Sequence, residues 1–273
     1  MSEILDQTLE CAKEILGAQA LDLKIERAVV GLFFSGVKLQ GGACGLSYTP
    51  LKSLSSAVCC PSQASAMPDS GNIAGKSVRY LLRDLNSAAP LKKTLALAAL
   101  NALGRVCFDK IRADYDVKFG ADPFEQLRIE RGSFSVVVGA LVPYIKTLMK
   151  NGADFKILEL DKSTLKQAEL PFYLPASEAS SVVPRADNVI ITATTLINDT
   201  LGGLLRLKKS GAKLVLVGPT TPLLPQALFE RGVDFAGGTL VRDADAVLDI
   251  IAQAGSGYHF LGKFADKITI CRG

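Results

Sequence analysis

The sequence has no tryptophan and one histidine, His259, among its 273 residues. Its six cysteines stand at positions 11, 44, 59, 60, 107 and 271, and none form a Cys-x-x-Cys pair. Structural zinc and iron–sulfur sites usually take ligands from such close pairs. The adjacent Cys59 and Cys60 are poorly placed to share one ion. We therefore expect six free thiols and no metal held directly by the protein.

Long apolar runs and strong charge of one sign are also missing. No stretch reaches about 18 consecutive apolar residues, so we expect no membrane-spanning helix. The opening residues, MSEILDQTLECAKEIL, carry acids where a secretory signal would carry basic residues, which favours a cytoplasmic protein. The net charge is only +4, from 31 basic and 27 acidic residues, with no basic stripe. A nucleic acid is therefore not an expected partner.

What the chain does have is enough apolar sequence, 48% of residues, to form the core of two domains. A helix is predicted over the first 16 residues. Two strands, 25–34 and 37–40, flank a turn at Ser35-Gly36, and a third follows Gly41-Gly42. After a Ser/Pro/Gly-rich loop, helices are predicted over 78–85 and 90–103. These elements predict an N-terminal α+β domain over residues 1–110.

The pattern of apolar residues changes after a charged segment, 111–133, which we interpret as a linker. Short β-branched runs then alternate with helical segments, as in a parallel sheet buried on both faces. The sequence predicts an α/β protein whose second domain, 134–273, is a Rossmann-like three-layer unit with a mostly parallel sheet. The predicted strands are 134–138, 155–160, 188–192, 213–217, 233–235 and 267–271.

Ligands of open parallel sheets bind beyond the carboxyl ends of the strands. Gly139 follows the first such strand, but the three glycines of a dinucleotide-binding turn are missing. A single-glycine turn still permits a nucleoside or an S-adenosyl group. Glu159 ends the second strand, 20 residues after Gly139, where an acid commonly binds ribose hydroxyls. The alternative for Glu159 is a solvated strand-end carboxylate.

The next two loops are rich in hydroxyl groups. Thr192, Thr194, Thr195 and Asn198 follow the third strand, where they could bind a ligand or, with Thr195 or Asn198 as N-cap, cap a helix. Gly218, Thr220 and Thr221 follow the fourth strand, before a helix predicted to start near Pro222. This loop could hold an anion on the helix N-terminus, or be a proline-rich connection with a threonine cap.

Four runs in the chain resemble a bacterial and archaeal family labelled "putative heavy-metal chelation": GLFFSGVKLQGGACGLSYTP, LALAALNALG, VIITATTLINDTL and LVLVGPTTPLLP. The resemblance covers nearly the whole chain and is most specific in ITATTLIN and GPTTPLLP. It implies an enolase-N-terminal-like domain joined to a Rossmann-like domain, with a ligand site where they meet, vaguely similar to the S-adenosylmethionine site of methyltransferases. It also adds Phe34 and Asn101 as site residues, and implies a role in metal or chelator metabolism.

Three functions remain open. The first is an enzyme of condensation, hydrolysis or group transfer on a pterin-, tetrapyrrole- or siderophore-like chelator, with Glu159 as the catalytic acid. The second is a carrier of a metal complex, without chemistry, and the third is a methyltransferase-like enzyme that uses S-adenosylmethionine. Two or more titratable groups in the ligand cleft would favour an enzyme. No cofactor can be named, the expected partner is a small molecule or metal complex, and a homo-oligomer stays open.

Overall fold

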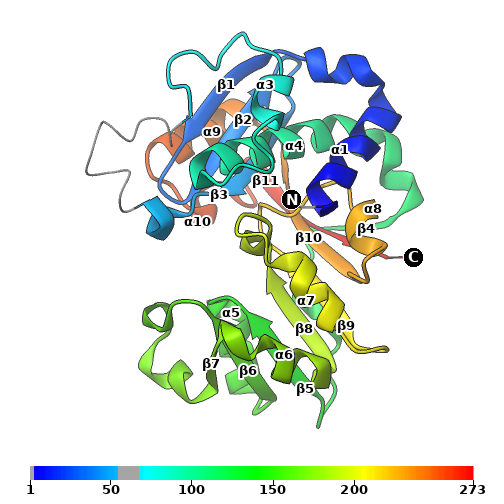
Figure 1. The fold of residues 1–273 in the computed structure, drawn as a ribbon, viewed down its shortest axis with the longest axis vertical. Helices are drawn as coiled ribbons and strands as arrows, with labels where there is room; N and C mark the ends of the chain where they lie inside the picture. The colour runs from blue at the N-terminus through cyan, green and yellow to red at the C-terminus, as the bar shows by residue number, and fades with distance from the viewer. Residues whose placement is uncertain (1–2, 55–67, 273) are drawn as a thin grey trace.

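The computed structural model describes residues 3–54 and 68–272, so Cys59 and Cys60 lie outside the described residues. It is an α/β protein with two sheets. A three-stranded antiparallel sheet is formed near the N-terminus, and an eight-stranded, mostly parallel sheet is formed by the rest of the chain. Figure 1 shows the small sheet and its helices above one end of the large sheet.

The N-terminal part begins with an amphipathic helix, as its spacing of apolar residues predicts. Its elements are α1 (Glu3–Leu16), β1 (Ile25–Val30), β2 (Phe34–Leu39), β3 (Cys44–Tyr48), α3 (Arg79–Leu82) and α4 (Pro90–Ile111). The turn predicted at Ser35-Gly36 is wrong, because both residues lie in β2 and pair with β1. Gly36 is there for packing: a Cβ on it would lie 2.5 Å from Leu248 Cδ2.

Helix α4 is the central helix of the N-terminal part and is buried along most of its length. Pro90 occupies its first turn, where a missing N–H costs nothing. The helix continues past Gly104, which was predicted to end it. Gly104 lies against Leu223, with a Cβ position 3.3 Å from Leu223 Cβ, so this glycine serves a close contact inside the helix.

The large sheet has the order β4-β11-β10-β9-β8-β5-β6-β7. The six strands from β10 to β7 are parallel, and β11 and β4 join antiparallel at one edge. All six predicted strands are present, although the fifth starts two residues late and runs on to Val241. The strands are β4 (Asp116–Phe119), β5 (Phe134–Val138), β6 (Asp154–Glu159), β7 (Tyr173–Pro175), β8 (Asn188–Thr192), β9 (Lys213–Val217), β10 (Phe235–Val241) and β11 (Ala265–Cys271).

Strand β4 lies inside the segment 111–133, which the sequence indicated to be a linker without strands. It pairs with β11, 146 or more positions later in the chain, through contacts such as Phe119 with Ile268 and Asp116 with Cys271. The segment also contains a short 3-10 helix, Pro123–Leu127. The position of the domain boundary stays a prediction.

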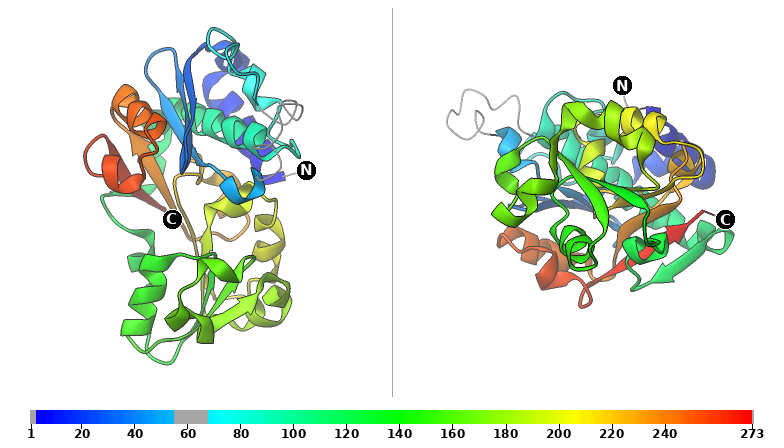
Figure 2. Two further views of the ribbon diagram at one scale, coloured as in Figure 1. Left: turned by 90° about the vertical axis from the view of Figure 1, so that its left-hand side faces the viewer. Right: turned by 90° about the horizontal axis from the view of Figure 1, so that it is seen from below.

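Helices cover both faces of the large sheet. One face packs on α5 (Val142–Lys150), and the other packs on α7 (Leu201–Leu207), α8 (Gln226–Phe229) and residues of α4. The remaining helices are α6 (Ala179–Val182), α9 (Ala244–Ala252) and α10 (Gly257–Phe260). Helix α9 returns to the N-terminal part and packs on the face of the small sheet opposite α4 (Figure 2). Within residues 3–54 and 68–272, no helix is both long and apolar enough to cross a bilayer.

Candidate functional site

A cavity of about 850 Å³ lies between the carboxyl ends of β5, β6, β8 and β9 and the N-terminal part. We call it the strand-end cavity. The N-terminal part contributes a wall that includes Tyr48, Pro50 and Lys52. Eight of the site residues predicted from the sequence line this cavity: Phe34, Gly139, Glu159, Thr192, Thr194, Asn198, Gly218 and Thr220. Its volume suits a ligand of drug-like size.

The strand order explains why these loops meet. From β5 the chain moves outward to β6 and β7, then returns to β8 on the other side of β5. Such a reversal opens a crevice between the loops that follow the two central strands. The loops approach closely: a Cβ at Gly139, where φ is 99°, would lie 2.6 Å from Thr192 Cγ2. Only glycine fits there.

The loop after β5 offers few backbone donors to a ligand. Gly139 N donates to Leu158 O at 2.9 Å, Leu141 N to Gly139 O at 2.8 Å and Val142 N to Ala140 O at 2.9 Å. The next residue, Pro143, has no N–H. A pyrophosphate would need several of these amides free. This turn is therefore unsuited to cradle one.

Glu159 is partly engaged by the end of its own strand. Its Oε1 accepts hydrogen bonds from Leu160 N at 2.7 Å and Asp161 N at 3.1 Å, so one oxygen holds the end of its own strand. Its side chain nevertheless lines the strand-end cavity. One carboxylate oxygen remains for a ligand.

The hydroxyl-rich loop after β8 is partly a set of local caps. Thr192, not Thr195 or Asn198, is the N-cap of the 3-10 helix Ala193–Leu196. Thr195 Oγ1 donates to Thr192 O at 2.7 Å, and Asn198 Oδ1 accepts from Thr200 Oγ1 at 2.7 Å. Among the described residues, the Thr194 hydroxyl has one hydrogen-bond partner, Thr192 Oγ1, at 3.2 Å. Thr194 is thus the hydroxyl on this loop with most capacity left for a ligand.

Thr195 does not line the strand-end cavity. It is buried and borders an adjoining cavity of about 640 Å³, which lies beyond the same strand ends on the side of α6 and α7. Glu159, Thr194 and Asn198 border both cavities.

The loop after β9 is held by the N-terminal part. Tyr48 N donates to Thr220 Oγ1 at 2.9 Å, and the buried Asn101 amide donates to Leu46 O at 2.9 Å and to the carbonyls of Pro219 and Thr220 at 3.3 Å. Asn101, expected from the resemblance to be a ligand residue, therefore joins the two parts of the chain and lies outside the lining of the strand-end cavity. Gly218, with φ of 125°, permits the turn.

The helix predicted to start near Pro222 begins only at Gln226 and has four residues. Pro222 and Pro225 lack N–H groups, so helical hydrogen bonding starts beyond them. Thr221 is buried, and its hydroxyl has no hydrogen-bond partner among the described residues. The predicted helix start is therefore wrong, and the Thr220 hydroxyl already accepts a hydrogen bond; an anion site on this loop stays a prediction.

The sequence analysis missed an ion pair beside the cavity, between Lys93 of α4 and Asp199. Lys93 Nζ lies 2.5 Å from Asp199 Oδ2, and the lysine side chain is 1% exposed. Nζ makes no hydrogen bond of good geometry to a described residue. Asp199 is 51% exposed, has φ of 59°, and lines both cavities. The only sequence signal was a lysine inside the apolar helix LKKTLALAALNALG.

A second ion pair, Lys52 with Asp161, also borders the cavity and is exposed. The Lys52 ammonium, with help from Ser163, lowers the pKa of Asp161 to about 2. Both lysines come from the N-terminal part, and both carboxylates come from strand-end loops. The cavity is thus bridged by opposite charges at two places.

Replacing Lys52 with alanine should raise the pKa of Asp161 part of the way to its ordinary value, because the contact with Ser163 remains. The folded pKa lies below the unfolded one, so the pair stabilises the fold fully above about pH 4 and loses this effect as the pH falls toward 2. Carboxyl NMR titration of the wild type and variant measures the shift. An unchanged Asp161 pKa would show that Lys52 does not act on this carboxylate.

The described residues offer few metal ligands. Among the residues that the structure describes, no group of three or more His, Cys, Asp or Glu could hold one. Cys11, Cys44, Cys107 and Cys271 are free but buried. Burial raises the pKa of the Cys44 and Cys107 thiols to about 12, whereas metals bind the thiolate. His259 is exposed, and its Nδ1 accepts from Ser256 N at 3.0 Å.

Comparisons with known proteins agree on one family. Two family models with the description "Putative heavy-metal chelation" match residues 13–104 and 122–270. An uncharacterized protein of Methanocaldococcus jannaschii is 29% identical over 68% of this chain and 69% of that protein.

Two solved structures of proteins with unknown function share the fold. The one from Pyrococcus horikoshii has a TM-score of 0.76 and 20% identity, and the one from Desulfitobacterium hafniense has 0.74 and 23%. Each alignment covers 98% of this chain and 100% of the other. With its second family model alone spanning residues 122–270, the chain belongs to the family described as "Putative heavy-metal chelation".

Proposed function

We propose that the strand-end cavity binds a small polar molecule and that the protein acts on it as an enzyme of condensation, hydrolysis or group transfer. One observation carries this proposal: Glu159, Asp161, Asp199 and Lys52 line the same cavity. Titratable groups that converge in a cleft are typical of catalytic sites, and a plain carrier has no need of them.

The architecture supports the same proposal. The order β7-β6-β5-β8-β9-β10 corresponds to the order 3-2-1-4-5-6 of doubly wound, Rossmann-like sheets. We take residues 134–273 as the Rossmann-like domain and residues 1–110 as an enolase-N-terminal-like lid over its ligand edge. Residues 111–133 join them.

Asp199 is the strongest candidate for proton transfer. One oxygen of Glu159 is occupied by its own loop, and Asp161 is engaged by Lys52. Asp199 is also paired with a lysine, the buried Lys93, but its carboxylate is half-exposed and borders both cavities. Glu159, through its second oxygen, is the alternative acid, and Thr194 and Asn198 would orient the ligand.

A chelator-type substrate reconciles the family description with the donor set. A pterin, a tetrapyrrole or a siderophore would bring any metal as part of the ligand, so that the protein needs no cluster of thiolates or imidazoles. A metal-complex carrier is the second candidate, and the many neutral hydroxyl and amide groups on the loops favour it. The S-adenosylmethionine alternative rests on Glu159 as a ribose ligand and on the single-glycine turn at Gly139.

The first experiment is mass spectrometry of small molecules that co-purify with the full chain, with elemental analysis of the same sample. If the protein is an enzyme, the same organic molecule, its substrate or product, should be found whether or not the sample contains a metal. A metal complex recovered unchanged after incubation would favour the carrier.

Replacing Thr194 with alanine should weaken binding of the co-purified molecule by about 1–3 kcal/mol, because a ligand group would lose its partner. The free energy of unfolding should change little, since within the part of the chain that the structure describes this hydroxyl has one hydrogen-bond partner, Thr192 Oγ1. Equilibrium dialysis and urea unfolding measure the two effects. Thr164→Ala is a matched control: it also borders the cavity, but its hydroxyl already donates to Asp161 O at 2.7 Å. Equal affinity in the Thr194 variant and wild type would place the ligand elsewhere.

A further inference from the structure

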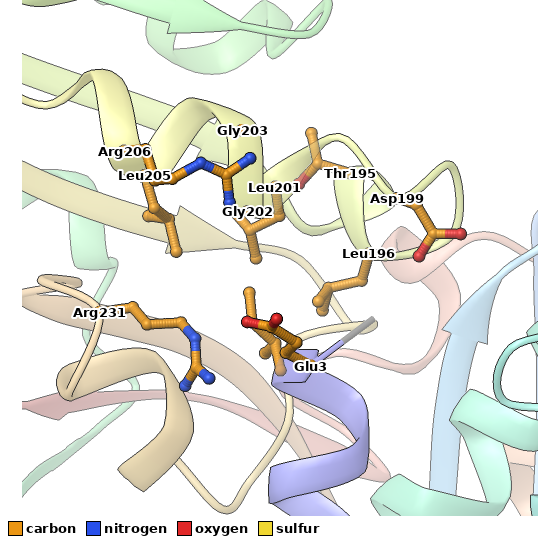
Figure 3. A pocket seen from close by; sticks show the side chains of 11 residues that line it. Glu3, Thr195, Leu196, Asp199, Leu201, Gly202, Gly203, Leu205, Arg206 and Arg231 are labelled. Carbon is orange, nitrogen blue, oxygen red and sulfur yellow. The ribbon is translucent and has the colours of Figure 1, made fainter. Parts of the chain in front are cut away.

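A separate cavity of about 420 Å³ lies between the start of α1, helix α7 and the segment after α8. We call it the α1–α7 cavity. It shares only Asp199 with the strand-end cavity, but Thr195, Asp199, Gly203 and Arg206 also border the adjoining cavity of about 640 Å³. Apolar side chains form much of its wall, namely Ile4, Leu196, Leu201 and Leu205, which are buried. Figure 3 shows Leu196, Leu201 and Leu205 of this wall together with the charged residues of the lining.

Two guanidinium groups border this cavity. Arg206 comes from α7 and Arg231 from the segment after α8, and Figure 3 shows both with Glu3 of α1 around the same space. The Arg206 side chain is exposed and makes no hydrogen bond or ion pair with any other described residue. Arg231 Nη1 donates to Gln7 Oε1 and, at 2.9 Å, to Ala227 O, so its other nitrogens keep donors. The remaining charged group is Asp199, which is paired with Lys93.

Two consecutive glycines, Gly202 and Gly203, line the cavity near Arg206, inside the seven-residue helix α7. A glycine inside a helix costs up to about 1 kcal/mol relative to alanine. At Gly203 no other atom would lie within 4 Å of a Cβ, so packing does not demand the glycine. At Gly202 a Cβ would lie 3.7 Å from Arg206 Nη1. Because Gly202 and Gly203 have no side chains, there is room for the Arg206 guanidinium and an open volume next to it.

We propose that the α1–α7 cavity binds a small organic anion. Arg206 and Arg231 would hold a carboxylate or phosphate group, and the leucine wall would hold an apolar body. Guanidinium groups bind both anions in a bidentate geometry, and the cavity volume suits a small molecule. Glu3 faces the same space, so its negative charge opposes the anion. The proposal does not rest on the function proposed for the strand-end cavity, although the two sites share Asp199.

The test is a titration of the full chain with phenyl phosphate and with benzoate, followed through the amide NMR signals of Gly202 and Gly203. Benzyl alcohol, which has the same ring without the charge, is the matched ligand control. With both anions the shifts of these signals should reach a plateau. The anion that binds with the higher affinity identifies the preferred anionic group. Benzyl alcohol should give no such plateau.

Three variants sharpen the result. Arg206→Ala should weaken binding about tenfold or more, because a charge-assisted contact is lost, and Arg206→Lys should restore only part of it. Glu3→Gln should strengthen binding several-fold, an effect of opposite sign that a misfolded variant would not give. Arg79→Ala, an exposed arginine of α3 that borders none of these cavities, should leave binding unchanged. The proposal is overturned by equal binding of benzyl alcohol, by unchanged affinity in Arg206→Ala, or by shifts confined to Gly139 and Gly218.

Discussion

A Gly45→Ala variant should lose about 3 kcal/mol or more of its free energy of unfolding, because β3 packs directly on the backbone of α4. A Cβ at Gly45 would lie 2.1 Å from Ala102 N and 2.3 Å from Ala98 O. These are main-chain atoms of a buried helix, so no side chain can rotate away. The midpoint of thermal unfolding should fall by roughly 6–12 °C for a chain of this size.

Gly203→Ala is the matched control for this loss. Its position is also a glycine in regular structure, but nothing lies within 4 Å of the added Cβ. Alanine should therefore stabilise α7, by about 0.5–1 kcal/mol. Urea unfolding of both variants gives the comparison. If Gly45→Ala were as stable as the wild type, the contact between β3 and α4 would have to be looser than the structure has it.

The second large effect is expected at the Lys93–Asp199 pair. Asp199→Asn keeps the shape of the side chain and suits the left-handed turn, since asparagine tolerates a positive φ. It removes the charge that faces an ammonium with 1% exposure. Breaking a buried pair costs about 3–5 kcal/mol, and because water reaches the half-exposed Asp199 we expect a loss near the lower end, about 3 kcal/mol.

Removal of the lysine instead should be much milder. Lys93→Met leaves only the exposed carboxylate, which water solvates, and places an apolar side chain among the residues of α4. The double variant Lys93→Met/Asp199→Asn should recover most of the stability lost in Asp199→Asn alone. A double-mutant cycle in urea measures the coupling. Additive effects of the two changes would mean that the pair contributes nothing specific.

The same variants separate stability from function. If Asp199 transfers a proton, Asp199→Asn loses turnover even in the Lys93→Met background, where the fold is restored. If Asp199 serves only to balance Lys93, the double variant regains both stability and activity toward the molecule that co-purifies. This comparison needs that molecule to be identified first.

The large sheet was predictable because its central strands are buried on both faces and have no need of polar alternation. Runs such as the one from Asn188 to Thr192 can be identified as strands by their β-branched residues. The strands β4 and β7 were missed, since each is short and lies at an edge of the sheet, where burial does not select apolar residues. The gathering of Gly139, Glu159 and Thr194 in one cavity follows from strand order, which the alternation of strands and helices suggests but does not fix.

Other features depended on contacts that no local pattern reveals. Glycine in the sequence indicated a turn at Gly36 and a helix end at Gly104, but both serve contacts with side chains more than 100 positions away. Lys93 was overlooked because lysine in a helix normally faces water. Its burial makes sense only once Asp199 is brought against α4 by the fold of the whole chain.

The small N-terminal sheet lies between α4 and α9, and α9 is formed by residues 244–252. Leu248 and Ile251 of α9 press against β2 and Gly31, and Arg27 of β1 bonds to Asp249 with an N–O distance of 2.7 Å. During synthesis the strands of this sheet leave the ribosome long before that helix does. One apolar face of the first sheet therefore stays uncovered until about the last ninth of the chain is made. In the cell, a chaperone or a wrong partner would bind this uncovered face during that interval.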